Sequence, residues 1–255
     1  MIDLIIFSVR ESLYAINLEK VKRIIQVPAL TPIPNSHELV EGMISYESDI
    51  LKVIGFRQIL EYPSYASELE TLFIELKKQH LSWIEALKNS VERDIAFQKT
   101  TNAHMCELGK WLDSFTSYDD EVTLILSELN KFHKRLHNSA VDILEWLEKG
   151  EKERAKEYLD TTVYETYNRT IAQIDLFIEK FLLVADSLQK ILLYQGSGVT
   201  FAVKVDSIED ILHVKEQMIV SSDDNHRVNS FLEIEGIIEI DNRLINVIKE
   251  ITLPS

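Results

Sequence analysis

With 42 acidic residues against 27 basic ones, the 255-residue chain has a formal net charge of −15. This charge argues against nucleic acid or an anionic membrane as a partner, because both attract positive patches. An apolar content of 45% and a charged content of 27% are typical of a soluble globular protein with a substantial core.

The sequence also predicts a cytoplasmic location. No apolar run is long enough to span a membrane, and the first residues are typical of a strand rather than of a signal peptide. The single cysteine cannot form an internal disulfide, which fits a reducing compartment.

Proline and glycine usage divides the chain into three parts. Four of the five prolines lie before residue 64, whereas residues 64–186 contain no proline and only two glycines. This composition favours a helical centre between two flanks that are rich in strands and turns. We therefore expect one domain to be formed by residues 1–65 and 187–255, and a helical domain, residues 66–186, to be inserted into it.

The first flank predicts mainly strands. Residues 4–9 and 12–16 are short and β-rich, and residues 42–45 and 50–54 are typical of a hairpin. Between them, Leu18, Val21, Ile24 and Ile25 have helical spacing, which predicts two helical turns before an extended, proline-rich connection.

The centre predicts four helices. The first runs from about 68 to 98, with a capping box at its start, and a short second helix covers about 103–112. The third begins among the acidic residues after Ser117 and ends at Gly150. The fourth continues to about 185 and should serve only for packing, since it carries no histidine or cysteine.

The second flank returns to strands. Residues 191–194 and 199–203 predict a hairpin with its turn at 195–198, and residues 231–240 and 244–251 predict two further strands. A polar loop is expected at 221–229, and residues 205–211 precede it without a predicted element type.

One thiol and three imidazoles in the centre form a candidate metal site. The candidate ligands are His80, Cys106, His133 and His137, a four-coordinate set that suits tetrahedral Zn²⁺. On a helix, His133 and His137 lie on one face and could bind one ion together. Each residue alone has an ordinary explanation, since such a histidine pair is more often exposed and a single cysteine is usually a small core residue. His104 is excluded, because on a helix it would point away from Cys106.

The spacing around these residues resembles the chemoreceptor zinc-binding domain. The matching motifs are H-x-x-W at residues 80–83, C-x-L-G-x-W at 106–111 and H-x-x-x-H at 133–137. The resemblance implies a helical bundle that holds one zinc ion through the four candidate ligands.

The flanks resemble the chemotaxis coupling (CheW-like) family. The matching segments are residues 14–21, 30–34, 41–44, 201–208 and 234–237. The resemblance implies a multidomain α+β protein in which two small five-stranded β-barrels, without catalytic residues, are interrupted by the zinc-binding four-helix bundle. It also implies chemoreceptors or the chemotaxis histidine kinase as partners. Glu47 stands where the family has an arginine implicated in receptor contacts, and this reversal of charge would disfavour ordinary docking.

Two functions remain open on this basis. The chain could be a chemotaxis adaptor in which the metal-bound thiolate senses zinc level or an oxidant such as hypochlorite. Alternatively, the zinc could be permanently bound and purely structural, in a scaffold or interaction protein. An enzyme is disfavoured, because four protein ligands leave no position for water on the metal. The sequence leaves open whether the bundle forms a homodimer.

Overall fold

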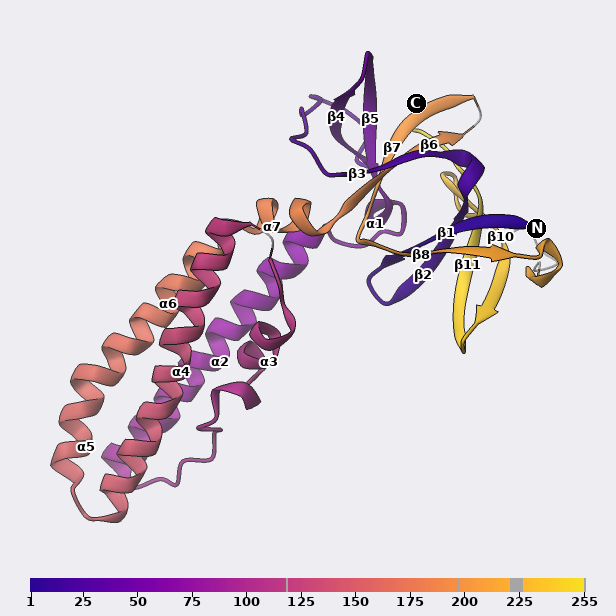
Figure 1. The fold of residues 1–255 in the computed structure, drawn as a ribbon. Coiled ribbons are helices and arrows are strands. Elements are labelled where there is room, and N and C mark those ends of the chain that lie inside the picture. The colour runs from indigo at the N-terminus through magenta and orange to yellow at the C-terminus, as the bar shows by residue number, and fades with distance from the viewer. Residues whose placement is uncertain (118, 197, 221–226, 255) are drawn as a thin grey trace. The chain divides into compact units, whose positions relative to one another are not determined.

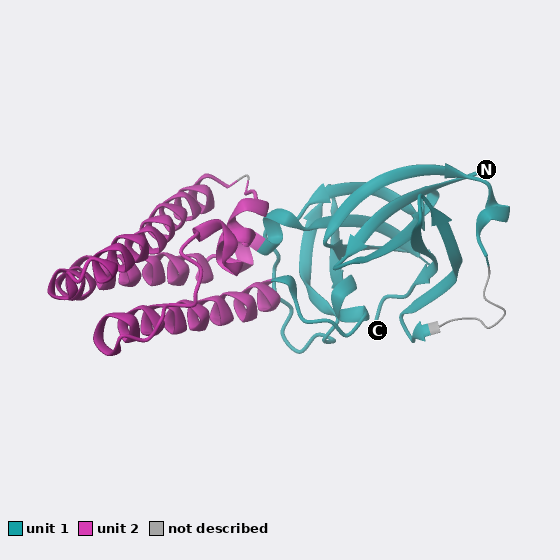
Figure 2. Ribbon diagram, turned by 90° about the horizontal axis from the view of Figure 1, so that it is seen from below, with its two compact units in different colours: residues 1–65, 185–255 teal, residues 66–184 magenta. Residues whose placement is uncertain are grey.

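The computed structural model describes residues 1–117, 119–196, 198–220 and 227–254. The chain forms two compact units, which are distinguished by colour in Figure 2. The sheet unit comprises residues 1–65 and 185–255, and the helical unit comprises residues 66–184. In the part of the chain that the structure describes, no helix is both long and apolar enough to cross a membrane.

The first sheet of the sheet unit combines strands from both flanks (Figure 1). Its strand order is β8-β1-β2-β11-β10-β9. The strands are β1 (Ile2–Val9), β2 (Ser12–Asn17), β8 (Ser207–Val214), β9 (Arg227–Asn229), β10 (Leu232–Ile240) and β11 (Arg243–Ile251). Strand β2 lies between β1, with Ala15 opposite Ile6, and β11, with Ala15 beside Val247. Neither flank could therefore complete this sheet alone.

The second sheet is also shared between the flanks, in the order β3-β6-β7-β5-β4. Its strands are β3 (Val21–Gln26), β4 (Val40–Tyr46), β5 (Asp49–Gly55), β6 (Lys190–Gly196) and β7 (Val199–Val205), and the short helix α1 (Phe56–Ile59) follows β5. The sheet curls until its edges meet: Thr31, beyond β3, exchanges backbone hydrogen bonds of 2.9 and 2.8 Å with Met43 of β4. The Arg23 guanidinium also donates to the Tyr46 hydroxyl at 2.8 Å.

The expected fold class is confirmed, with two differences in the flanks. The sheets have six and five strands rather than five each, and the additional short strand β9 lies in the predicted loop 221–229, of which residues 221–226 fall outside the described ranges. Residues 18–25 do not form the predicted helix. A 3₁₀ turn at Leu18–Lys20 leads directly into β3, since β-branched Val21, Ile24 and Ile25 fit a strand that pairs with β6.

The two sheets share one apolar core, to which Ile5 and Phe7 of β1, Leu192 and Tyr194 of β6 and Ile248 of β11 contribute. Complete burial of such side chains contributes about 1.5–3 kcal/mol each, so the core unites the two flanks across the insertion.

A buried ion pair lies in the sheet unit where the chain leaves it and re-enters it. The Arg57 guanidinium donates to both carboxylate oxygens of Asp206 at 2.7 Å. Arg57 also donates to the Pro63 carbonyl at 3.2 Å and lies over the Tyr65 ring. The Gln189 amide donates to Asp206 at 3.0 Å. One charge pair thus contacts both connections to the helical unit.

The helical unit contains α2 (Tyr65–Arg93), α3 (Glu107–Ser114), α4 (Asp120–Glu148), α5 (Lys152–Tyr158), α6 (Tyr164–Ile178) and the first half of α7 (Phe181–Leu188). The first predicted helix is displaced, because α2 begins before the expected cap and ends at Arg93, followed by Asp94 at φ 56°. The predicted fourth helix is interrupted by a π-helical turn at Leu159–Val163 and ends at Ile178 before α7 begins.

Candidate metal centre

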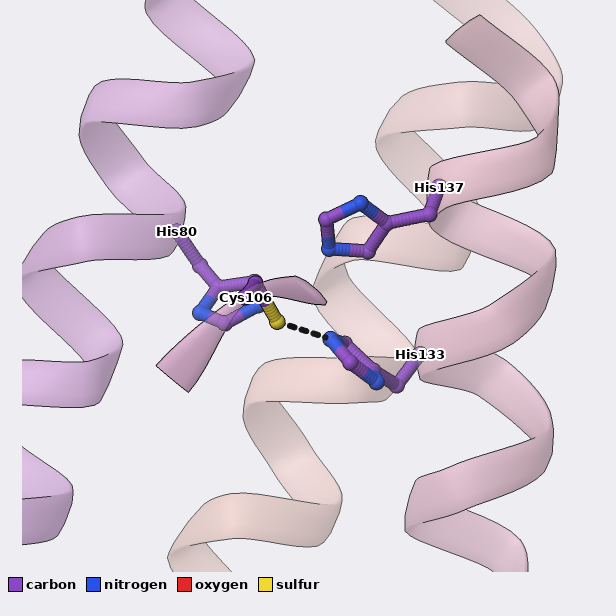
Figure 3. A group of neighbouring side chains, drawn as sticks. All are labelled: His80, Cys106, His133 and His137. Atoms are coloured by element: carbon purple, nitrogen blue, oxygen red, sulfur yellow. Dashed lines mark hydrogen bonds between the residues drawn. The ribbon is translucent and has the colours of Figure 1, made fainter. Parts of the chain in front are cut away.

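The four candidate ligands come together in the helical unit (Figure 3). His80 lies on α2, Cys106 immediately precedes α3, and His133 and His137 lie on α4. One ligand atom from each residue can be chosen such that all four lie within 4.8 Å of one another. A group of this size can close around one small cation.

Helical periodicity explains why the histidines point inwards. His80 continues the buried stripe of α2 that includes Phe73, Leu76 and Trp83. His133 and His137 are four residues apart on the buried face of α4. The exposed fractions of His80, His133 and His137 are 3%, 0% and 0%. Buried imidazoles are costly without polar partners, so this placement itself indicates a ligand.

The hydrogen bonds of two histidines determine which ring nitrogen faces the centre. Nδ1 of His80 lies 2.8 Å from the Leu76 carbonyl, and Nδ1 of His137 lies 3.1 Å from the Thr100 carbonyl. A carbonyl only accepts, so each Nδ1 carries the proton and each Nε2 keeps a lone pair. Both Nε2 atoms are buried and have no hydrogen-bond partner among the described residues. They are free to bind a metal.

His133 faces the thiol directly, with its Nε2 3.1 Å from the Cys106 sulfur. Its Nδ1 is buried and has no hydrogen-bond partner among the described residues. In the metal-free protein, the His133 Nε2 and the Cys106 sulfur would share one proton between their lone pairs. A cation between them would satisfy both lone pairs.

Cys106 is the N-cap of α3, where its sulfur accepts a hydrogen bond from the Gly109 N–H at 3.3 Å. Burial raises the pKa of the thiol, and the backbone N–H groups of Gly109 and Leu108 oppose this rise. A side chain at Gly109 is excluded, because its Cβ would lie 1.7 Å from the Ala103 carbonyl oxygen. The glycine of the motif therefore lets the segment before Cys106 pack against α3.

The pKa values of the imidazoles favour neutral ligands. Burial lowers the pKa of His133 to about 2, with further contributions from His80 and His137. Burial and then His80 lower the pKa of His137 to about 4, and burial also lowers the pKa of His80. All three rings are therefore uncharged near neutral pH, the form that binds a metal.

These shifts predict a pH-dependent stability of the metal-free protein. The unfolded chain takes up protons near pH 6.5, whereas folded His137 does so near 4 and His133 near 2. The stabilisation is therefore complete above about pH 6.5 and is lost as the pH falls towards 4 and then 2. His137 alone contributes at most about 3 kcal/mol. The urea midpoint of zinc-free protein should fall between about pH 7 and pH 5; a constant or rising midpoint would contradict this expectation.

His104 lies outside the group. Its side chain is exposed, and its Nδ1 is 2.7 Å from a carboxylate oxygen of Asp113. It occupies a 3₁₀ turn, Ala103–Met105, rather than the helix expected from the sequence.

A cavity of about 410 Å³ adjoins three of the four side chains. His80, Cys106 and His137 line it together with polar residues that include Lys78 and Lys99. The half-buried thiol can therefore be reached by a small molecule or ion without unfolding of the helices.

The donor set fits zinc. Three imidazole nitrogens and one sulfur match tetrahedral Zn²⁺ coordination, and the buried Nε2 atoms of His80 and His137 have no hydrogen-bond partner in the described part of the chain. The sequence pattern did not indicate the Thr100 carbonyl, which contacts His137, because any residue type provides a backbone oxygen.

Glu47 lies in the turn between β4 and β5, at φ 53° and exposed to solvent. This turn belongs to the sheet unit, so Glu47 is available for contact with a partner and has no part in the metal centre.

Comparison with known proteins gives two family matches. The model of the CheW-like domain matches residues 3–91, and that of the chemoreceptor zinc-binding domain matches residues 80–144. No curated protein matches the chain. Residues 190–251 lie outside both matches, although their strands complete both sheets.

Two solved structures are similar. The scaffolding protein TtCheW from Thermoanaerobacter tengcongensis is 12% identical, with a TM-score of 0.46 over 97% of this chain and 88% of the other. The regulatory CZB domain of DgcZ is 14% identical, with a TM-score of 0.38 over 46% of this chain and 98% of the other. The two family models, rather than these structures, identify a CheW-like domain and a chemoreceptor zinc-binding domain in parts of the chain, and this pair of domains indicates chemotaxis-related signalling with zinc binding.

Proposed function

We propose that this combination of a CheW-like domain with a chemoreceptor zinc-binding domain is a cytoplasmic chemotaxis adaptor that senses zinc or an oxidant. We assign residues 1–65 and 187–255 to the CheW-like domain, and residues 66–186 to the inserted bundle. Support for this division comes from the two compact units, whose boundaries lie at residues 65/66 and 184/185.

His80, Cys106, His133 and His137 are the proposed zinc ligands. The observation that carries this assignment is the convergence of their donor atoms within 4.8 Å, including two imidazole Nε2 atoms that have no other partner among the residues that the structure describes. Bound zinc would supply the positive charge that holds Cys106 as a thiolate against the effect of burial on its pKa. Four protein ligands favour a sensory or structural role over catalysis.

The proposed signal leaves the bundle through α7. At the end of α7, the Gln26 side chain of β3 donates to the carbonyls of Asp186 and Ser187 at 3.0 and 2.7 Å. The Lys204 ammonium of β7 lies 3.3 Å from the Asp186 carboxylate. A displacement of α7 would therefore act on β3 and β7 within the sheet unit.

The thiolate provides the proposed redox sensitivity. Hypochlorous acid would oxidise it by two electrons to sulfenic acid and would itself be reduced to chloride. The cavity beside Cys106 gives a small oxidant access, and the chain has no second cysteine that could form an internal disulfide. A sulfenic acid binds zinc more weakly than a thiolate, so oxidation should release the metal.

One experiment separates a sensor from a structural zinc site. Zinc-loaded protein is treated with sub-stoichiometric hypochlorite or a graded chelator, and zinc release is followed together with hydrogen exchange in residues 187–251. A sensor should lose exchange protection in these residues as zinc leaves. If zinc leaves and exchange protection in residues 187–251 is unchanged, the metal is purely structural and the alternative scaffold function holds.

Glu47 is proposed to weaken or redirect binding to chemoreceptors. Glu47→Arg removes the charge reversal in the exposed β4–β5 turn and should strengthen co-sedimentation with assembled receptors and kinase. Glu11→Arg, at another exposed position of the sheet unit, is the control with the same change in net charge. Binding that is already complete in the unmodified protein, and unchanged by Glu47→Arg, would show that the turn has no such role.

A further inference from the structure

The carbonyl oxygen of Thr100 lies between two donors from different helices. The indole N–H of Trp83 on α2 donates to it at 2.8 Å, and Nδ1 of His137 on α4 donates to it at 3.1 Å. Trp83 also contacts the His137 ring, with centroids 5.0 Å apart. The tryptophan and the histidine are therefore connected both by a direct ring contact and through one backbone oxygen.

We propose that Trp83 is a positioning residue for His137, which it holds in place through the Thr100 carbonyl. This inference rests on the proposed zinc ligation. The carbonyl determines which His137 nitrogen carries the proton, and hence which one offers a lone pair to the metal. The indole determines where that carbonyl lies.

Comparison with His80 shows why an additional residue is needed to orient the His137 ring. The Nδ1 of His80 donates to Leu76, four residues earlier on the same helix, so α2 itself orients this ring. The Nδ1 of His137 instead donates to a carbonyl outside α4, in the non-helical segment that follows α2. Without a second contact, that carbonyl could move relative to α4.

The segment around Thr100 has a local hydrogen bond and a further contact with the indole. The Thr100 hydroxyl accepts a hydrogen bond from the Asn102 N–H at 3.1 Å, and the Phe97 ring packs edge-on against Trp83 at 5.5 Å. The Trp83 N–H bond thus connects this segment to α2 close to His80. Loss of a hydrogen bond that orients a metal ligand typically lowers metal affinity 10- to 100-fold. We therefore expect zinc affinity to fall by a factor in that range when the Trp83 N–H bond is removed.

The test compares Trp83→Phe with the unmodified full-length chain. Zinc affinity is measured by competition with a chromogenic chelator, and the variant should bind zinc about 10- to 100-fold more weakly. Trp111→Phe is the matched control, since Trp111 packs against Phe73 and Phe115 and is not one of the proposed ligands; its affinity should change much less. Replacement of Trp83 by 3-benzothienylalanine, which has nearly the same shape but no N–H, tests the bond if the phenylalanine variant folds poorly.

A double-mutant cycle shows whether Trp83 acts through His137. In a His137→Ala background, removal of the Trp83 N–H should cause no further loss of zinc affinity. The cobalt(II)-loaded Trp83 variants should also show altered d–d bands at saturation, which a purely structural effect on folding would leave unchanged. Equal losses in both backgrounds, or unchanged affinity and spectra, would overturn the inference while leaving zinc ligation intact. Failure of the unmodified chain to bind zinc would instead refute the proposed function itself.

Discussion

His133→Ala is expected to lower zinc affinity more than about 100-fold, beyond the effect typical of contacts outside the coordination shell. His133 is fully buried, and its Nε2 lies 3.1 Å from the Cys106 sulfur, so its removal takes away one of four donors at the centre of the group. Zinc content after reconstitution, measured by elemental analysis, should fall from one ion per chain to well below that value. Zinc should also no longer raise the thermal stability of the variant, because stabilisation by a ligand requires binding.

His104→Ala is the matched control for this prediction. His104 is close to Cys106 in sequence, but it is exposed and paired with Asp113. Its removal should leave zinc content and zinc-dependent stability unchanged. Equal zinc content in the His133→Ala and unmodified proteins would contradict the assigned ligand set, as would loss of zinc in the His104→Ala variant.

Arg57→Ala is expected to destabilise the sheet unit by about 3–5 kcal/mol, because it leaves a largely buried carboxylate without its cation. The side chains of Arg57 and Asp206 are only 3% and 10% exposed. The Gln189 amide would remain as a hydrogen-bond donor to Asp206 but brings no charge. Urea unfolding monitored by hydrogen exchange should show a lower free energy of unfolding in residues 190–251 and at the two connections next to this pair.

Two comparisons test whether burial of the pair causes this effect. Lys249→Ala removes an ion pair with Glu233 in which the lysine side chain is 53% exposed, and it should cost less than about 1 kcal/mol. The double variant Arg57→Met, Asp206→Leu removes both charges and should be more stable than Arg57→Ala alone. A cost for Arg57→Ala as small as that for Lys249→Ala would rule out this role of the buried pair.

Local patterns sufficed for much of the fold. The predicted β-rich segments correspond to β1, β2, β6, β7, β10 and β11, and the first predicted helix corresponds to α2 apart from its ends. These predictions succeeded because side-chain periodicity reflects burial on one face of a helix or strand. The same periodicity failed at residues 18–25, where pairing with β6 determined a strand, and at the end of α2, which breaks at Asp94.

The amino-acid sequence by itself indicated the donor types of the candidate metal centre, and helical spacing placed His133 and His137 on one face of α4. It also indicated that two strand-rich flanks enclose a helical insertion. Only the tertiary structure decided how those flanks interleave, with β2 between β1 and β11. It likewise placed the Thr100 carbonyl between Trp83 and His137. Such arrangements depend on contacts between residues far apart in sequence and on backbone atoms common to every residue type, and neither leaves a local sequence pattern.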